Sequence, residues 1–256
     1  MSLSVCCFAS GSKGNCCLVT DGETNLLIDL GISALRAELC LRAVAVDPNS
    51  VHVLVTHSHS DHVAGIKTFH KKFPRSVVHC QSESCAEICR LVGLAPTVDE
   101  RDFVIGGIAV SAVPVPHDVP CFGYVLHSKK KSVAIVTDVG AIKEPTLDML
   151  CGCGLVVLEA NHDPDMLRNN RNYSAALKMR IASQHGHLSN PDCAKACAYL
   201  AGHGVKNFIL AHLSEDNNDP ELAATVVARG IESAGISDAR VVCASQNKPT
   251  GMYELC

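Results

Sequence analysis

The sequence predicts an α/β fold in which two mixed β-sheets pack against each other and helices flank them on the outside. Short apolar runs bounded by turn residues recur along the first half of the chain, as expected for buried strands. Stretches in which apolar residues have helical spacing lie between these runs and lengthen in the second half. Because strands and helices alternate in both halves and no low-complexity linker divides them, we expect one domain spanning residues 1–256.

The predicted strands are short apolar segments. In the first half they span Leu3–Phe8, Cys16–Val19, Asn25–Ile28, Val51–Val55, Val77–Cys80, Ile108–Val113, Phe122–Leu126 and Val133–Val136. In the second half we expect strands at Leu155–Leu158, Phe208–Leu210, Val241–Ala244 and Met252–Leu255.

Helices are predicted where apolar residues recur every three or four positions. They span Ala64–Phe73, Glu83–Val92, Glu144–Leu150, Tyr173–Ile181, Pro191–Leu200 and Pro220–Ala234. Asn190, which precedes Pro191 and Asp192, is expected to cap the N-terminus of one of the longer helices, because an Asn side chain can accept a hydrogen bond from the first turn.

Composition is that of an ordinary globular protein: apolar residues make up 47% and charged residues 19% of the chain. The first twenty residues hold one Lys and no Arg, and their apolar stretch is interrupted by the polar segment Ser10 to Asn15, which fits neither a signal peptide nor a membrane span. We therefore expect a cytoplasmic protein without membrane contact. The net charge of −4 argues against a globally basic nucleic-acid wrapper, but a nucleic acid could still be met through metal ions.

The 15 cysteines are expected to be reduced, because their number is odd and no export signal is visible. Two pairs, Cys85/Cys89 and Cys193/Cys197, have the i, i+4 spacing of metal ligands. Each pair lies in an apolar helical pattern, however, and free Cys behaves as a small hydrophobic residue. Buried core thiols are therefore the preferred interpretation.

The densest group of polar side chains is the run Thr56-His57-Ser58-His59-Ser60-Asp61-His62. It places three imidazoles and a carboxylate directly after a predicted buried strand and before a predicted helix. On one short loop these donors lie close enough together to hold two cations. The alternative is a solvated His-rich turn. The Asp between imidazoles, and Gly65 at the tight start of the following helix, favour the metal site.

Three later strands also lead to side chains that bind metals. Val110 to Val115 precedes His117, Val133 to Thr137 precedes Asp138, and Phe208 to Ala211 precedes His212. Taken singly, each is more typical of a cap or turn residue. Together with the run at 57–62 they complete a metal site.

The pattern H-x-H-x-D-H, followed at a distance by His, Asp and His, resembles the metallo-β-lactamase superfamily, whose fold is an αββα sandwich. Five further motifs are similar to those of the YycJ (WalJ) family of bacterial exonucleases, and the resemblance covers nearly the whole chain. The motifs are Phe8-Ala9-Ser10-Gly11-Ser12-Lys13-Gly14-Asn15, Pro116-His117-Asp118, Glu159-Ala160-Asn161-His162-Asp163, Gly186-His187-Leu188-Ser189-Asn190 and His212-Leu213-Ser214-Glu215-Asp216-Asn217-Asn218.

The resemblance implies two divalent metal ions. One would be held by His57, His59 and His117, the other by Asp61, His62 and His212, and Asp138 would bridge the two. Such a pair would hold a hydroxide as nucleophile and stabilise charge on a phosphodiester, with Asp61 and Asp138 as catalytic carboxylates. Imidazole and carboxylate ligands suit zinc, manganese and iron alike.

Candidate substrate contacts lie outside this ligand set. His187 resembles the Gly-His motif that β-CASP nucleases use at the scissile phosphate, so we expect it to contact phosphate or to protonate the leaving group. A His packed at a helix start is the alternative. His162 and Ser189 belong to the neighbouring motifs. The loop of Ser10, Ser12 and Asn15 could offer N–H groups to a phosphate, or be a plain hairpin turn.

Three functions are therefore open. The first is a DNA exonuclease, with DNA favoured over RNA because of the family resemblance. The second is a small-molecule phosphodiesterase, or another ester or thioester hydrolase on the same fold. The third is a non-catalytic metal-binding module, which the complete set of seven ligands argues against.

Overall fold

The computed structural model describes residues 2–129 and 131–255, and its strands form two sheets of seven strands each. The order of the first sheet is β14-β1-β2-β3-β4-β5-β6, and that of the second is β13-β12-β11-β10-β9-β8-β7. The first comprises β1 (Leu3–Ala9), β2 (Cys16–Thr20), β3 (Asn25–Ile28), β4 (Val51–Leu54), β5 (Val77–Gln81), β6 (Thr97–Asp99) and β14 (Tyr253–Leu255). The second comprises β7 (Asp102–Ile105), β8 (Ile108–Val115), β9 (Cys121–Ser128), β10 (Lys131–Val136), β11 (Leu155–Glu159), β12 (Asn207–Ala211) and β13 (Arg240–Cys243).

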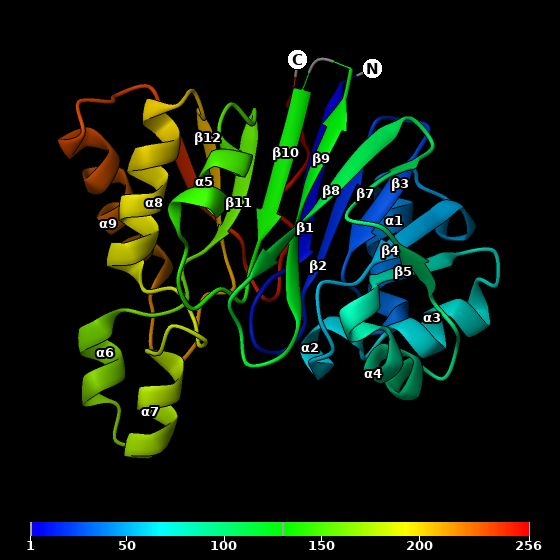
Figure 1. Ribbon diagram of the computed structural model, residues 1–256, viewed down its shortest axis with the longest axis horizontal. Helices are drawn as coiled ribbons and strands as arrows, with labels where there is room; N and C mark the ends of the chain where they lie inside the picture. Colours follow the sequence, from blue (N-terminus) through cyan, green and yellow to red (C-terminus); the bar gives the residue numbers. More distant parts are fainter. Residues whose placement is uncertain (1, 130, 256) are drawn as a thin grey trace.

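Helices cover both outer faces, so the molecule has four layers in the order α, β, β, α (Figure 1). On the side of the first sheet lie α1 (Ala34–Ala43), α2 (Ser60–Val63), α3 (Ile66–Lys72) and α4 (Ser82–Val92), with a 3₁₀ turn, η1 (Pro48–Ser50). On the side of the second lie α5 (Glu144–Leu150), α6 (Pro164–Asn169), α7 (Ala175–Ile181), α8 (Asn190–Gly202) and α9 (Pro220–Ser233). The predicted sandwich of two mixed sheets with external helices is confirmed.

Alternation along the strands builds three apolar layers, as shown by β1, which is buried on both faces. Val5 and Cys7 belong to the core between the two sheets. Cys6 and Phe8 point the other way, into the core beneath the helices of the first sheet. Successive side chains of a strand leave opposite faces, so a central strand of a four-layer sandwich must be apolar at nearly every position.

The strand directions gather several loops at one edge. Strands β3, β4, β5 and β6 are parallel, and so are β10, β11, β12 and β13, while the remaining pairs are antiparallel. Strand β8 consequently runs in the same direction as β10. The carboxyl ends of β8, β10 and β12 therefore lie at the same edge of their sheet, as do those of β3 and β4 in theirs.

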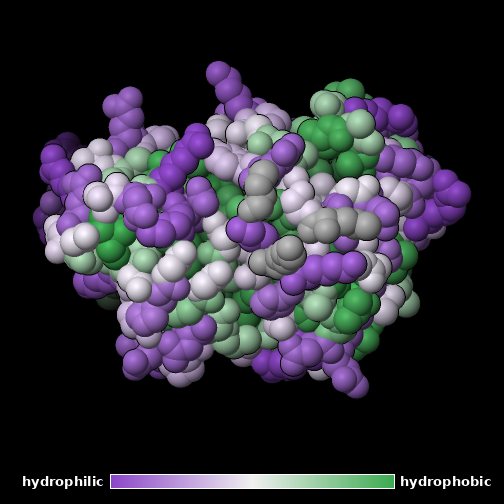
Figure 2. Space-filling model, turned by 90° about the horizontal axis from the view of Figure 1, so that it is seen from above, coloured by the Kyte–Doolittle hydropathy of each residue, from purple (hydrophilic) through white to green (hydrophobic). Residues whose placement is uncertain are grey.

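The two chain ends lie at the opposite end of the molecule from α2 (Figure 1). Figure 2 looks onto the end that carries them, where hydrophilic side chains are interspersed with smaller hydrophobic patches. Within residues 2–129 and 131–255, no helix is both long and apolar enough to cross a membrane.

Apart from the 3₁₀ turn η1, five elements were not predicted: α1, α2, α6, β6 and β7. Helix α1 lacks a clear apolar face, since Leu35 and Leu39 are 62% and 60% exposed, and it begins where the Ser33 side chain accepts a hydrogen bond from Arg36 N. Strands β6 and β7 are short and lie at sheet edges, with mostly exposed or half-buried residues. Their apolar runs are too short for a periodic signal.

The N-cap of α8 was predicted one residue too late. Ser189 is the cap, and its side chain accepts a hydrogen bond from Asp192 N. Asn190 is the first helical residue, and its buried amide exchanges hydrogen bonds with Asn218.

Cysteines in the described part of the chain are all free thiols. Cys193 and Cys197 are fully buried in the core beneath α8, as predicted. Cys85 and Cys89 are only half-buried.

Candidate metal centre

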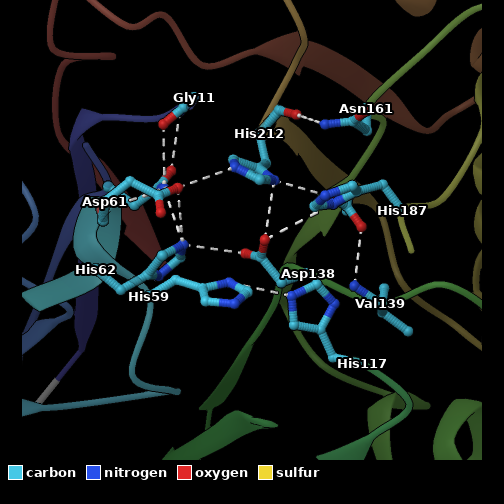
Figure 3. Close-up of polar contacts among 12 residues, drawn as sticks. Gly11, His59, Asp61, His62, His117, Asp138, Val139, Asn161, His187 and His212 are labelled. Atoms are coloured by element: carbon cyan, nitrogen blue, oxygen red, sulfur yellow. Dashed lines mark hydrogen bonds and ion pairs between the residues drawn. The ribbon is translucent and has the colours of Figure 1, made fainter. Parts of the chain in front are cut away.

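Loops from both sheets converge on one cluster of imidazoles and carboxylates (Figure 3). The loop after β4 and the short helix α2 carry His57 to His62, and the ends of β8, β10 and β12 lead to His117, Asp138 and His212. The structure brings all seven predicted metal ligands together. They form overlapping groups whose donor atoms lie within 4.8 Å of one another: His57, His59 and His117; His57, His62 and Asp138; and Asp61, His62 and His212.

The first group consists of three imidazoles. Nδ1 of His59 lies 3.0 Å from Nε2 of His57 and 3.4 Å from Nε2 of His117. Three ring nitrogens thus face one another at separations that suit a shared cation and that leave little room for anything larger. An all-nitrogen set of this kind suits zinc and other divalent transition metals.

The second group mixes imidazole and carboxylate donors. Oδ2 of Asp61 lies 3.4 Å from Nε2 of His62 and 3.5 Å from Nε2 of His212. Asp138 lies between the two groups, with its Oδ2 3.2 Å from Nε2 of His62. A carboxylate in this position can donate one oxygen to each of two neighbouring ions.

Backbone strain is concentrated at these strand ends. Asp29, Asp138 and His212 have φ angles of 61°, 56° and 54°, in the left-handed region that residues with a Cβ rarely adopt. Each such residue costs about 1–3 kcal/mol and persists only where surrounding contacts hold it. Here Asp29 N donates to Leu54 O and His212 N donates to the Ser10 hydroxyl. The sharp turn lets each side chain point back into the cluster.

Two buried carboxylates behind the ligands were missed in the sequence analysis. The Asp29 carboxylate accepts hydrogen bonds from Nδ1 of His62, at 2.7 Å, and from the Thr56 backbone, at 2.8 Å. The Glu159 carboxylate accepts from Nδ1 of His212, at 2.8 Å, and from Nδ1 of His187, at 2.9 Å. Because Nδ1 is engaged in each ring, Nε2 is directed at the cluster, an arrangement typical of metal-binding histidines.

The imidazoles and carboxylates of the cluster shift one another's pKa values. Burial and the neighbouring His62 lower the pKa of His57 well below its ordinary value. Burial opposes protonation of His212 too, but Asp138, Asp61 and Glu159 raise its pKa to about 10. Burial opposes ionisation of Asp138, yet His212 and His62 hold its pKa well below the usual range. Cation binding would therefore displace protons from imidazoles, as is general for metal sites.

The residues fit a bound metal. Oδ2 of Asp138 and Nε2 of His212 are buried, and neither has a hydrogen-bond partner of acceptable geometry among the described residues. Buried polar atoms are rarely left without a partner in native proteins. Both atoms belong to the cluster, so a cation bound there would satisfy them.

The loop between β1 and β2 braces the second group. Asn15 N donates to the Asp61 carbonyl at 2.7 Å, and Nδ2 of Asn15 lies 3.3 Å from the Asp61 carboxylate and 3.0 Å from Nε2 of His62. Ser10 accepts the hydrogen bond from His212 N. Ser12, at the tip, is exposed. Ser10 and Asn15 therefore hold ligand-bearing segments, while Ser12 is open to solvent.

The other predicted substrate contacts lie on the opposite side of the cluster. The His187 ring lies 5.2 Å from the His212 ring and 5.5 Å from that of His117, and its side chain is 18% exposed. His162 is buried and pairs through its backbone with Ser189, whose hydroxyl is engaged in capping α8. His187 is thus at the cluster, and His162 and Ser189 lie behind it.

The fold and the donor cluster together define a metal-dependent hydrolase of the metallo-β-lactamase type. The family model described as a beta-lactamase superfamily domain matches residues 24–213. A Bacillus anthracis protein described as exodeoxyribonuclease YycJ is 35% identical over 244 residues, covering 92% of this chain and 91% of that protein. The chain belongs to the metallo-β-lactamase superfamily and, within it, to the YycJ/WalJ family.

Two further comparisons agree with this assignment. A Streptococcus pneumoniae protein described as exodeoxyribonuclease WalJ is 29% identical over 260 residues, covering 96% of both chains. Among solved structures, the metallo-beta-lactamase fold protein YhfI from Bacillus subtilis superposes with a TM-score of 0.77 at 14% identity, covering 100% of both chains. At that identity the superposition shows the fold alone.

Proposed function

We propose that the protein is a metal-dependent DNA exonuclease, which releases nucleotides from an end of a DNA strand. The observation that carries this proposal is the pair of adjacent donor groups with Asp138 between them, in a chain whose relatives are described as exodeoxyribonucleases. Two neighbouring cations suit in-line cleavage of a phosphodiester, because the attacking and leaving oxygens both need charge stabilisation. The free thiols fit action in the reducing cytoplasm.

The proposed ligand set is the one named in the sequence analysis. His57, His59 and His117 would hold one ion, zinc, manganese or iron. Asp61, His62 and His212 would hold the second, and Asp138 would serve both. When bound, such ions supply an activated water and neutralise charge on the phosphodiester oxygens.

His187 acts on the substrate rather than on a metal. Burial opposes its protonation, but contact with Glu159 raises its pKa above the ordinary value, which favours the protonated ring. Its Nδ1 donates to Glu159, and the partly exposed ring can present Nε2–H to a phosphate oxygen or to the leaving oxygen. Glu159 thereby positions His187 and His212 at once.

The β1–β2 loop forms the opposite wall of the site. Ser12 at its exposed tip contacts the DNA backbone, and Ser10 and Asn15 act by keeping the loop against the metal ligands. His162 and Ser189 contribute to substrate binding from behind His187. The His162 ring lines a cavity there.

The test is release of mononucleotides from duplex DNA carrying a label at either the 5′ or the 3′ end, with an RNA duplex alongside. The wild type should shorten labelled DNA from one end, and Asp138→Asn should be inactive with its fold intact by circular dichroism. Hydrolysis of bis(p-nitrophenyl) phosphate without any action on DNA would instead favour a small-molecule phosphodiesterase. Metal binding without hydrolysis of any ester would favour a non-catalytic module.

A further inference from the structure

The segment that contains α6 and α7 packs differently from the rest of the molecule. Helix α7 has no buried residue, and α6 buries only Leu167. Figure 1 shows the two helices side by side beyond one end of α8. Met179 and Leu177 on α7 are 69% and 37% exposed. Short helices gain most of their stability from packing, so a helix this exposed has a surface available for a ligand.

Charge sets the same segment apart. Residues 164–185 hold four cations, Arg168, Arg171, Lys178 and Arg180, against a single acid, Asp165, in a chain whose net charge is −4. Arg168 pairs with Asp165, but the side chains of Arg168 and Arg180 remain 70% and 62% exposed. The segment is therefore a local basic surface on an acidic protein, which attracts a polyanion.

A cavity of about 360 Å³ lies between α6 and α7. Apolar side chains, among them Leu167 and Met179, line it together with His162, and Arg168 and Lys178 contribute to its wall. This volume is within the range of small-ligand pockets, which combine apolar walls with a few polar groups. The His162 ring is 3% exposed, and its Nδ1 has no hydrogen-bond partner among the described residues. The cavity therefore offers an apolar slot with cations beside it.

Helix α7 ends against the metal centre. Nη2 of Arg180 lies 3.3 Å from the Asp118 carboxylate, which in turn lies 3.3 Å from Nε2 of His59. At the same end of the helix, the Ile181 carbonyl accepts a 2.9 Å hydrogen bond from His187 N. An extended polyanion, such as a single DNA strand, that lay across α7 would therefore reach from the cavity to the metal ligands within the length of this one short helix.

We propose that the α6–α7 segment is the arm that holds a single strand of DNA, with one unpaired nucleobase in the cavity beside His162 and Met179 and the flanking phosphates at Arg168 and Arg180. An apolar slot bordered by cations matches a nucleobase bordered by phosphates. This inference rests on the proposed function, since it assigns the part of the site that holds the DNA during cleavage.

The basic surface is tested by measuring, through fluorescence anisotropy, how tightly the metal-loaded protein binds a short fluorescein-labelled single-stranded oligonucleotide with a cleavage-resistant phosphorothioate backbone. The double variant Arg168→Glu/Arg180→Glu should weaken binding by about tenfold or more, and the slope of log affinity against log salt should fall by about 1.4 for two lost phosphate contacts. The matched control is Lys67→Glu/Lys71→Glu on α3, an equal charge change on exposed residues of a helix outside the other sheet. Both double variants share the general effect of the lowered net charge. Apart from that effect, the control should bind the oligonucleotide as the wild type does.

The cavity is tested by Ala175→Phe, which fills it from an exposed position on α7. This variant should weaken binding of the oligonucleotide but not of an abasic strand of equal length, and it should hydrolyse bis(p-nitrophenyl) phosphate at the wild-type rate. Unchanged DNA affinity and salt slope in the double variant, or equal loss for both strands in Ala175→Phe, would overturn the arm. If the wild type bound the oligonucleotide through the arm but did not cleave DNA, the arm would be upheld and the proposed nuclease activity would be refuted.

Discussion

The Asp29 carboxylate accepts a 2.7 Å hydrogen bond from Nδ1 of His62, and both side chains are almost fully buried. Asp29 also accepts from the Thr56 hydroxyl, which itself lies 2.9 Å from Nδ1 of His57. One carboxylate outside the ligand set thus orients an imidazole of each donor group. On the other side of the cluster, Glu159 likewise orients two imidazoles, those of His212 and His187.

Asp29→Asn should lower metal affinity by about 10- to 100-fold, because an amide supports the His62 tautomer less well than a carboxylate does. Competition with a chromogenic zinc chelator measures this. Asp238→Asn, an equivalent change at an exposed ion pair with Lys206, is the matched control and should leave affinity unchanged. Equal affinity in Asp29→Asn and wild type would show that Asp29 does not tune the ligands.

Much of the candidate metal centre could be predicted because its donors are dense and follow strands. The run at 57–62 is conspicuous in the sequence, and His117, Asp138 and His212 each follow an apolar run. The same rule applied to two more strands would have found Asp29 after Asn25–Ile28 and Glu159 at the end of Leu155–Glu159. A single carboxylate after a strand is usually a turn residue, so its partner becomes evident only in three dimensions.

What the sequence could not predict depends on contacts between distant segments. The cap of α8 is Ser189 because Asn190 is drawn into a buried amide pair with Asn218, 28 residues away. Gly65 was expected to permit a tight start of a helix, but its φ of −82° is ordinary. It must be Gly because a Cβ there would overlap the Ile32 carbonyl, a close approach that local sequence does not reveal.

His187→Ala should reduce DNA cleavage by about 10²- to 10⁴-fold, as expected when a proton-donating group is lost, and should leave the metal content unchanged. The loss should appear in kcat rather than in retention of metal by the purified protein. His185→Ala is the control, because that residue is exposed and lies two positions before His187 in the chain. Wild-type turnover by a fully metallated His187→Ala would exclude the role in catalysis.

Gly31→Ala should lower the free energy of unfolding by about 1–3 kcal/mol, because the added Cβ would overlap the Asp61 carbonyl and displace α2. Urea unfolding measures this, and metal binding should weaken in parallel because α2 carries Asp61 and His62. Gly202→Ala is the contrasting change. Its Cβ would meet only the Ile236 side chain, at 4.0 Å, so it should stabilise α8 by about 0.5–1 kcal/mol. Two variants of equal stability would show that the Gly31 contact relaxes at no cost.

Removal of metal should destabilise the protein, because the buried Oδ2 of Asp138 and Nε2 of His212 then lose their partner. For one site with free metal at a hundredfold excess over Kd, the stabilisation lost is about 2.7 kcal/mol. Differential scanning calorimetry before and after chelation measures the fall in Tm, and restoring zinc or manganese should reverse it. Asp138→Asn serves as the control, since a chelator should shift its Tm by less than it shifts that of the wild type. If chelation left the wild-type Tm unchanged, the cluster would not be a structural metal site, and the donor groups would have to be satisfied by the hydrogen bonds and ion pairs among themselves.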